Sequence, residues 1–172
     1  MRPGLPLVLV SAWLAGPSAA RATDGESALS VTAGFGSFTV SQRADVSGAG
    51  GVLSLDYTYG IADSFWLRAA VGGGLYSASD QLTTGGSAAI GLHYAVDVLR
   101  YVPYVTGSVG VFYAGGGAVD AKAHLVLEVG AGVEIGEGRS FSWGIDARLA
   151  SFASGATTFM IGPRISFKFG YF

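Results

Sequence analysis

The chain has 172 residues, with 28 glycines, no cysteine, 13% charged residues and a formal net charge of −2. Its length fits a single domain, the absence of cysteine excludes disulfides and thiolate metal sites, and the small net charge gives no reason to expect a nucleic-acid partner. Glycine is too frequent for long helices, because each interior glycine costs about 0.5–1 kcal/mol relative to alanine. Composition therefore disfavours a helical fold.

The N-terminus has the three parts of a secretory signal peptide. Arg2 is followed by an apolar stretch from Leu5 to Leu14 and then by the small-residue end Ala20-Arg21-Ala22. A membrane anchor is the weaker interpretation, because a spanning helix needs about 20 apolar residues. We expect residues 1–22 to be removed by cleavage before Thr23, with the bond after Ala20 as the alternative. Residues 23–172 would then form one mature domain.

From residue 28 onward hydrophobicity alternates with a period of two, the repeat of a β-strand. The alternation divides into eight segments, at 28–36, 53–59, 65–75, 88–96, 104–113, 124–135, 141–149 and 159–171. Most have about the 9–11 residues that a tilted strand needs to cross a bilayer. The uncharged stretch 102–119 could instead be a helix, but Pro103, its glycines and its alternation argue against one. The sequence thus predicts an all-β protein of eight strands.

The connectors between these segments alternate in character. Those at 60–64, 97–101 and 136–140 are short, whereas those at 41–50, 77–85, 114–122 and 153–156 are mostly longer and rich in small or polar residues. Short turns at one end and longer loops at the other, with an even number of strands, are typical of a transmembrane up-and-down antiparallel β-barrel. We therefore expect the longer connectors to be loops at the cell-surface end.

The charges indicate which face of each strand would be inside. All ionisable strand residues lie on the parity opposite the large apolar residues: Asp56, Arg68, His93, His124, Glu128, Glu134, Asp146, Arg148, Arg164 and Lys168. A soluble sandwich would show the same alternation with the apolar face in its core. Most strand glycines share the charged parity, however, and a narrow, strongly curved barrel interior has a use for them that a solvent-facing surface lacks. We therefore expect the charged face in the lumen and the apolar face in lipid.

Aromatic residues gather at the strand ends. One group lies next to the short turns or the C-terminus: Tyr57, Tyr59, Phe65, Tyr94, Tyr101, Tyr104, Phe141, Trp143, Phe167, Phe169 and Tyr171. A sparser group at the other end comprises Phe35, Tyr113, Phe152 and Phe159. Such groups are typical of the aromatic girdles at the two membrane interfaces. Since hydrocarbon does not tolerate unpaired strand edges, the eight spanning strands must close.

The lumen charges are balanced in sign. Four acids face four bases: Asp56, Glu128, Glu134 and Asp146 against Arg68, Arg148, Arg164 and Lys168. Burying them is costly unless they are paired and hydrogen-bonded, so the balance predicts a salt-bridge network that plugs the lumen. The network could be structural packing of a closed barrel or a gate in a narrow pore. An eight-stranded barrel, whose interior side chains fill, favours the structural interpretation.

No catalytic motif accompanies these charges. The chain has no dinucleotide-binding glycine motif, no P-loop, no nucleophile elbow and no paired-histidine zinc motif. His93 and His124 are the only histidines, and they fall on different predicted strands without ligand spacing. We expect no enzyme activity, no cofactor and no metal.

On the eight alternating segments, the aromatic girdle and the terminal Phe172, residues 28–172 resemble the small eight-stranded barrels of the Gram-negative outer membrane, such as OmpX and the membrane domain of OmpA. The resemblance implies an integral, monomeric outer-membrane protein in contact with lipids and lipopolysaccharide. It also implies recognition of the strand ending at Phe172 by the assembly machinery. The expected role is structural or surface-interacting in the cell envelope, with a narrow channel for small solutes or ions as the alternative.

Overall fold

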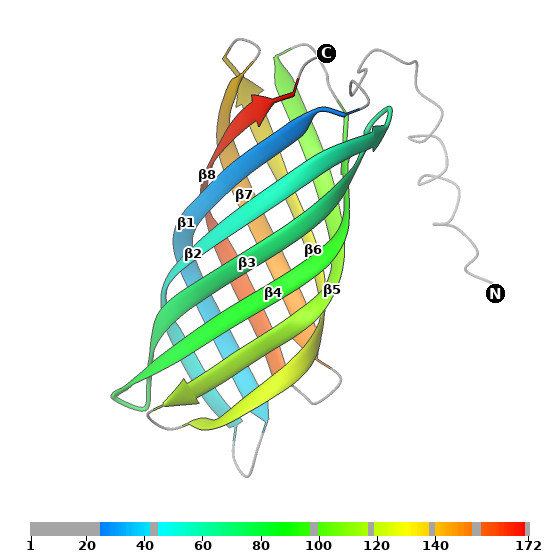
Figure 1. Ribbon diagram of the computed structural model, residues 1–172. Coiled ribbons are helices and arrows are strands. Elements are labelled where there is room, and N and C mark those ends of the chain that lie inside the picture. The colour runs from blue at the N-terminus through cyan, green and yellow to red at the C-terminus, as the bar shows by residue number, and fades with distance from the viewer. Residues whose placement is uncertain are drawn as a thin grey trace, which may run out of the picture.

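The computed structural model describes residues 25–41, 45–96, 100–116, 119–137, 140–152 and 156–170. They form eight antiparallel strands: β1 (Ser27–Ser41), β2 (Asp45–Ala62), β3 (Phe65–Ala78), β4 (Gln81–Ala95), β5 (Tyr101–Gly116), β6 (Val119–Gly136), β7 (Phe141–Phe152) and β8 (Ala156–Phe169). Each strand pairs with the next, and β8 pairs back onto β1 to close a barrel (Figure 1). Within the described part of the chain, no helix is long and apolar enough to cross a membrane. The predicted all-β, eight-stranded barrel is confirmed.

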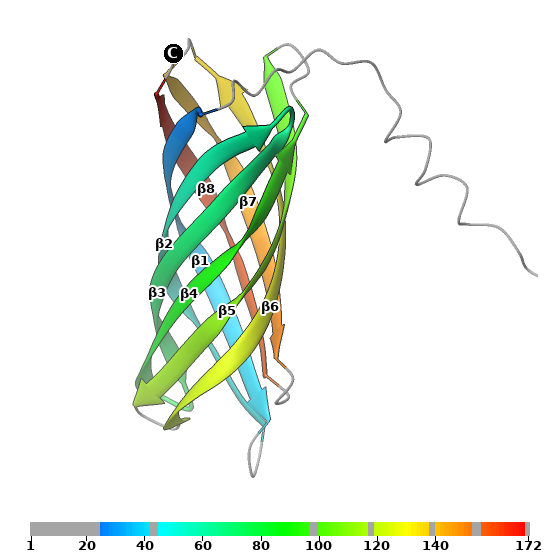
Figure 2. The same ribbon diagram turned by 45° about the vertical axis from the view of Figure 1, so that its right-hand side comes forward.

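The two ends of the barrel differ in their connections. We call the end where β1 begins and β8 ends the terminal end; it lies uppermost in Figure 1 and also carries the β2–β3, β4–β5 and β6–β7 connections. The opposite, distal end carries the β1–β2, β3–β4, β5–β6 and β7–β8 connections, as the turned view in Figure 2 also shows. The signal peptide predicted for residues 1–22 lies outside the described residues and stays a prediction.

The prediction of longer loops at the distal end is wrong for three of the four connectors, because the strands extend into them. Strand β3 continues to Ala78 and β4 begins at Gln81, so that Ser79 and Asp80 alone make the turn predicted to span 77–85. Both have positive φ, 49° and 59°, the conformation of a tight two-residue hairpin. Strand pairing likewise extends into 41–50, where β2 begins at Asp45, and into 114–122, where β5 reaches Gly116. These strand ends consist largely of small residues and carry little hydrophobic signal, although their backbones pair. In the fourth connector, residues 153–155 lie outside the described residues.

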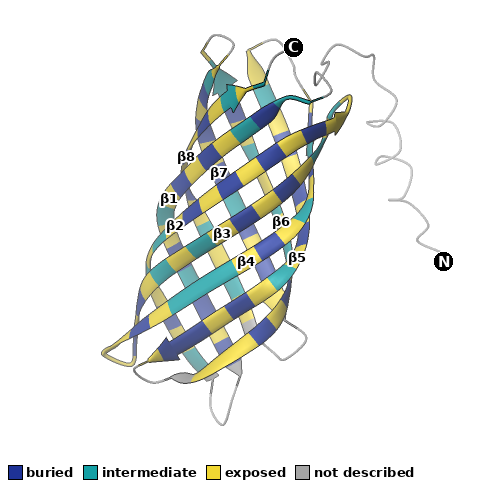
Figure 3. Ribbon diagram, in the orientation of Figure 1, coloured by how far each residue is buried: buried dark blue, intermediate teal, exposed yellow. Residues whose placement is uncertain are grey.

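The faces of the strands follow the predicted parity. Buried and exposed positions alternate along most of each strand in Figure 3, with a run of intermediate positions on β4. Leu127 and Ile90 are each 67% exposed on the outside, whereas Asp56 and Asp146 are 0% exposed inside. At the strand positions whose burial the structure describes, no charged residue has the outward parity of the large apolar residues. Apolar outside and polar inside is the reverse of a water-soluble protein and matches a barrel that stands in lipid.

Two inward-facing glycines, Gly34 on β1 and Gly162 on β8, lie where these two strands meet in the narrow interior. A Cβ added to Gly34 would lie 2.6 Å from the Cα of Gly162, and one added to Gly162 would lie 2.7 Å from the Cα of Gly34. Carbon atoms that are not bonded do not approach so closely. The two glycines therefore let β1 and β8 come together where the wall is most crowded, as the sequence interpretation of these glycines requires.

Candidate functional site

The lumen holds a network of ion pairs centred on Asp56 of β2. The Oδ1 atom of its carboxylate accepts a hydrogen bond from Arg68 Nε at 2.6 Å, and Oδ2 accepts one from Arg148 Nη2 at 2.6 Å and a longer one from Arg164 Nη1 at 3.4 Å. The three arginines come from β3, β7 and β8. One fully buried carboxylate therefore ties together strands from different sides of the barrel.

Arg68 extends this network to β5 and β6. Its Nη1 donates to Ser108 Oγ at 2.8 Å and to Glu128 Oε1 at 2.6 Å. Arg148 Nη1 donates to Ser54 Oγ at 2.9 Å. Both guanidiniums thus have several charged or hydroxyl acceptors at once, which is the arrangement a buried cation needs to offset its loss of water.

A second group of contacts lies around Glu134 of β6. Its Oε1 accepts hydrogen bonds from Arg164 Nε at 2.7 Å and from Ser166 Oγ at 2.8 Å, and its Oε2 accepts one from Ser142 Oγ at 2.5 Å. Because Arg164 also reaches Asp56, the two groups of contacts form one continuous network.

Tyr104 belongs to this network and not to the aromatic girdle predicted for it. Its ring is buried in the lumen, and its hydroxyl donates to Asp146 Oδ1 at 2.6 Å. Asp146 Oδ2 in turn pairs with Arg148 Nε at 2.5 Å. The Tyr104 ring stacks on His93 with centroids 4.7 Å apart and lies 5.3 Å from the Arg164 guanidinium carbon. Tyr104 has the inward parity of Thr106 and Ser108, so alternation, not proximity to a turn, was the correct guide.

Seven of the eight residues predicted for the lumen charge network are thus joined by ion pairs: Asp56, Arg68, Glu128, Glu134, Asp146, Arg148 and Arg164. Lys168 is not joined to them; it forms none of the ion pairs found among the described residues. It is half-buried and lines a small recess at the terminal end together with Glu26, Trp66 and His93. Six of the eight, three acids and three arginines, are buried, so the innermost charges cancel.

The distal part of the lumen has a different chemistry, which sequence reasoning missed. A cluster of inward-facing apolar side chains fills it, and we call this set the apolar cluster: Phe38, Val40, Tyr76, Ala78, Phe112, Ala114, Val126 and Ala150. Phe38 and Tyr76 meet edge to face, with ring centroids 5.1 Å apart and planes at 87°. The available signal was the inward parity of β1 continued past Gly36 to Phe38 and Val40.

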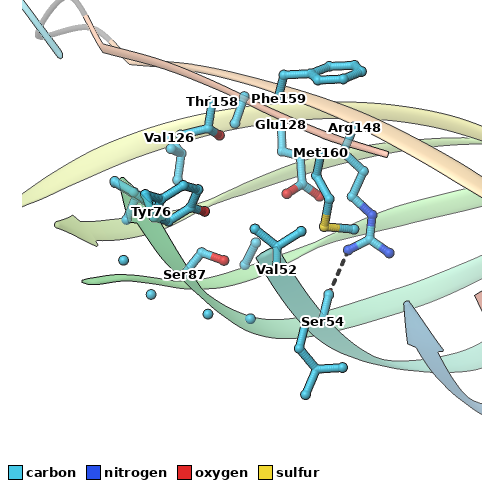
Figure 4. Close-up of a pocket in the computed structure, with 18 residues that line it drawn as sticks. Val52, Ser54, Tyr76, Ser87, Val126, Glu128, Arg148, Thr158, Phe159 and Met160 are labelled. Carbon is cyan, nitrogen blue, oxygen red and sulfur yellow. Dashed lines mark hydrogen bonds between the residues drawn. The ribbon is translucent and has the colours of Figure 1, made fainter. Parts of the chain in front are cut away.

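A cavity of about 60 Å³ lies between the apolar cluster and the ion-pair network. Tyr76, Phe112 and Val126 of the cluster line one side, and Ser54, Glu128 and Arg148 of the network line another. Figure 4 shows Ser87 and Met160 at the same cavity, with the hydrogen bond from Arg148 to Ser54 drawn as a dashed line. The space suffices for a few water molecules. We call it the chamber.

The histidines lie in different surroundings. His93 pairs in register with Thr106 beside Tyr104, whereas His124 pairs with Phe112 next to the apolar cluster. Both are buried on the lumen side. Among the described residues, no group of three or more histidine or carboxylate side chains is placed to hold a metal ion.

Three solved structures of outer-membrane barrels have a fold similar to that of this chain. Neisserial surface protein A is 14% identical, with a TM-score of 0.66, covering 84% of this chain and 97% of its own. The attachment invasion locus protein Ail of Yersinia pestis is 14% identical, with a TM-score of 0.58 and coverage of 86% and 100%. The N-terminal barrel domain of OprF from Pseudomonas aeruginosa is 17% identical, with a TM-score of 0.52 and coverage of 83% and 97%.

No protein-family model matches the chain, and no curated protein matches it. The likeness to solved structures therefore concerns the fold, which is that of the eight-stranded barrels of the Gram-negative outer membrane. The exterior of this fold is apolar, as in a β-barrel whose strands cross a membrane.

Proposed function

We propose that this chain is an integral outer-membrane barrel whose lumen is closed, with a structural or surface-interaction role in the cell envelope. The observation that carries the proposal is the filled lumen. Asp56 and its three arginines cross it in one half, and the apolar cluster occupies the other. A barrel so filled offers its outer surface and its exposed ends for interaction, and not a water-filled pore.

In this proposal the terminal end, where β1 begins and β8 ends, faces the periplasm, and the distal end faces the cell surface. The apolar exterior would contact outer-membrane lipids and lipopolysaccharide as a monomer. Cleavage of residues 1–22, and recognition of the strand ending at Phe172 by the assembly machinery, are part of the same proposal.

Two measurements test this function. The mature protein should fractionate with outer membranes and change its gel mobility on boiling, as folded barrels resist unfolding in detergent. Reconstituted into a planar bilayer, the wild-type protein should give little or no current. Recovery as a soluble periplasmic protein would contradict the barrel in the membrane, and large steady single-channel currents would contradict the closed lumen.

The second candidate is a narrow channel for small solutes or ions. The chamber favours it, because it is a space inside the lumen that the polar side chains of Ser54, Glu128 and Arg148 line on one side. A channel would need the network or the cluster to move aside, and steady conduction by wild-type protein would establish that it does. Enzyme activity has no supporting arrangement of residues in the part of the chain that the structure describes.

A further inference from the structure

We infer that the barrel is closed by two seals in series, the apolar cluster on the distal side and the ion-pair network on the terminal side, with the chamber enclosed between them. The inference rests on the proposed closed barrel and adds to it how the closure works. Either seal alone would then keep the lumen closed to ions. Opening one seal would admit solvent to the chamber from one end only.

The distal seal excludes water by its chemistry. Phe38, Val40 and Ala78 are each no more than 2% exposed, and the rings of Phe38 on β1 and Tyr76 on β3 meet edge to face. A constriction lined mainly by apolar side chains offers passing water and ions few hydrogen bonds, and such constrictions gate channels by losing their water. No charge needs to move for this seal to hold.

The terminal seal closes the lumen by bonding across it. Arg148 links Ser54 and Asp56 of β2 to its own strand β7, and Arg68 links β2 to Glu128 of β6. An ion entering this region would have to displace a guanidinium from a buried carboxylate, which leaves a charge unpaired. This barrier is electrostatic and independent of the apolar packing.

The position of the chamber makes the two seals separable. Its lining includes Tyr76 and Phe112 from one seal and Glu128 and Arg148 from the other. Ser87 also lines it and belongs to neither seal (Figure 4). Since the chain has no cysteine, Ser87→Cys would place a single thiol at the chamber without background.

The experiment combines thiol labelling with conductance. The distal seal is opened by Phe38→Ala with Tyr76→Ala, and the terminal seal by Arg148→Ala with Asp146→Ala, which removes one base and one acid. A matched control, Phe35→Ala with Tyr113→Ala, removes two exposed aromatic side chains from the outside of the barrel, one on β1 and one on β5. Folding of each variant is checked by the gel shift on boiling. Tyr76→Ala alone and Arg148→Ala alone replace the pairs if a paired variant does not fold.

In detergent, both ends of the barrel meet solvent, so a small charged thiol reagent needs only one open seal to reach Ser87→Cys. Its labelling rate should rise by at least about tenfold when either seal is opened, the factor that corresponds to about 1.4 kcal/mol of protection. The control should label as slowly as Ser87→Cys alone. In a planar bilayer, only the variant with both seals opened should pass current.

Other results would overturn the inference. Current from either single-seal variant would mean that the remaining seal does not hold. Slow labelling in both single-seal variants, or fast labelling without current when both are opened, would mean that the chamber does not lie between the two. Current from the wild-type protein contradicts the closed barrel itself, so failure of the proposed function is distinguishable from failure of the two seals.

Discussion

The two halves of the lumen are built on the same inward-facing parity of the same strands, yet they are closed by opposite means. Toward the terminal end, β3 contributes Arg68 to an ion pair, and toward the distal end the same strand contributes Tyr76 to an apolar cluster. The charged half needs matched partners for every buried group, whereas the apolar half needs only volume and shape. Inward parity therefore states where a side chain points, not what chemistry it meets there.

The difference also sets how each half should respond to change. Replacing one member of a buried ion network leaves its partners uncompensated, so the damage spreads beyond the mutated site. Removing an apolar side chain leaves a cavity, whose cost depends on how far the neighbours collapse. The following substitutions separate these two responses.

Asp56→Ala should have the largest effect, because it deprives Arg68, Arg148 and Arg164 of a shared carboxylate. We expect a loss of about 3–5 kcal/mol in the free energy of unfolding, measured by urea titration in lipid vesicles. Removing Arg148 as well should restore part of the loss, since the two are direct partners. Asp63→Ala, in the β2–β3 turn, is the matched control and should change little. An Asp56→Ala protein as stable as wild type would show that the network does not stabilise the barrel.

Phe38→Ala should come next, at about 3 kcal/mol, because the side chain is almost fully buried against Tyr76 and leaves a cavity. Phe38→Leu keeps most of the volume and should cost less than about 1.5 kcal/mol. The same titration measures both. If leucine cost as much as alanine, the edge-to-face contact and not the filling of space would hold this half together.

Leu127→Arg should cost about 2–4 kcal/mol, because it places a charge on the lipid face near the middle of β6. From the sequence, arginine at the neighbouring inward-facing Val126 should cost less unless it clashes. Val126 belongs to the apolar cluster and is 4% exposed, so the structure predicts that it does clash. Comparable losses for both variants, with thiol access to the chamber raised only by Val126→Arg, would fit this placement. A harmless Val126→Arg would contradict it.

Some features of the barrel could be predicted from the sequence and others could not. Alternation over long strands predicted the barrel and the inward position of Asp56, Arg148 and the other charges, because a period of two follows directly from strand geometry. The pairing of particular charges depends on the register of the strands and the closure of the barrel, which the amino-acid sequence alone does not reveal. The apolar cluster was missed because the strands were ended too early: at Phe38, Val40 and Tyr76 large apolar residues occupy the inward parity, which carries glycine and polar residues in the preceding part of these strands. Lys168 shared the parity of the network but lies too near the terminal end to join it.

The smallest effect should come from an ion pair outside the lumen, which tests whether burial and not charge pairing itself gives the network its importance. Arg100 Nη2 lies 3.7 Å from Glu137 Oε1 at the terminal end, with the two side chains 64% and 52% exposed. Water and salt screen such a pair, so Arg100→Ala should change the free energy of unfolding by less than about 1 kcal/mol. Raising the salt concentration should remove even that difference, while the cost of Asp56→Ala should persist, because buried pairs are screened much less. The comparison is read from the two unfolding curves at low and high salt. Equal salt sensitivity of the two variants would mean that the lumen network is wet and that its ion pairs behave like those at the surface.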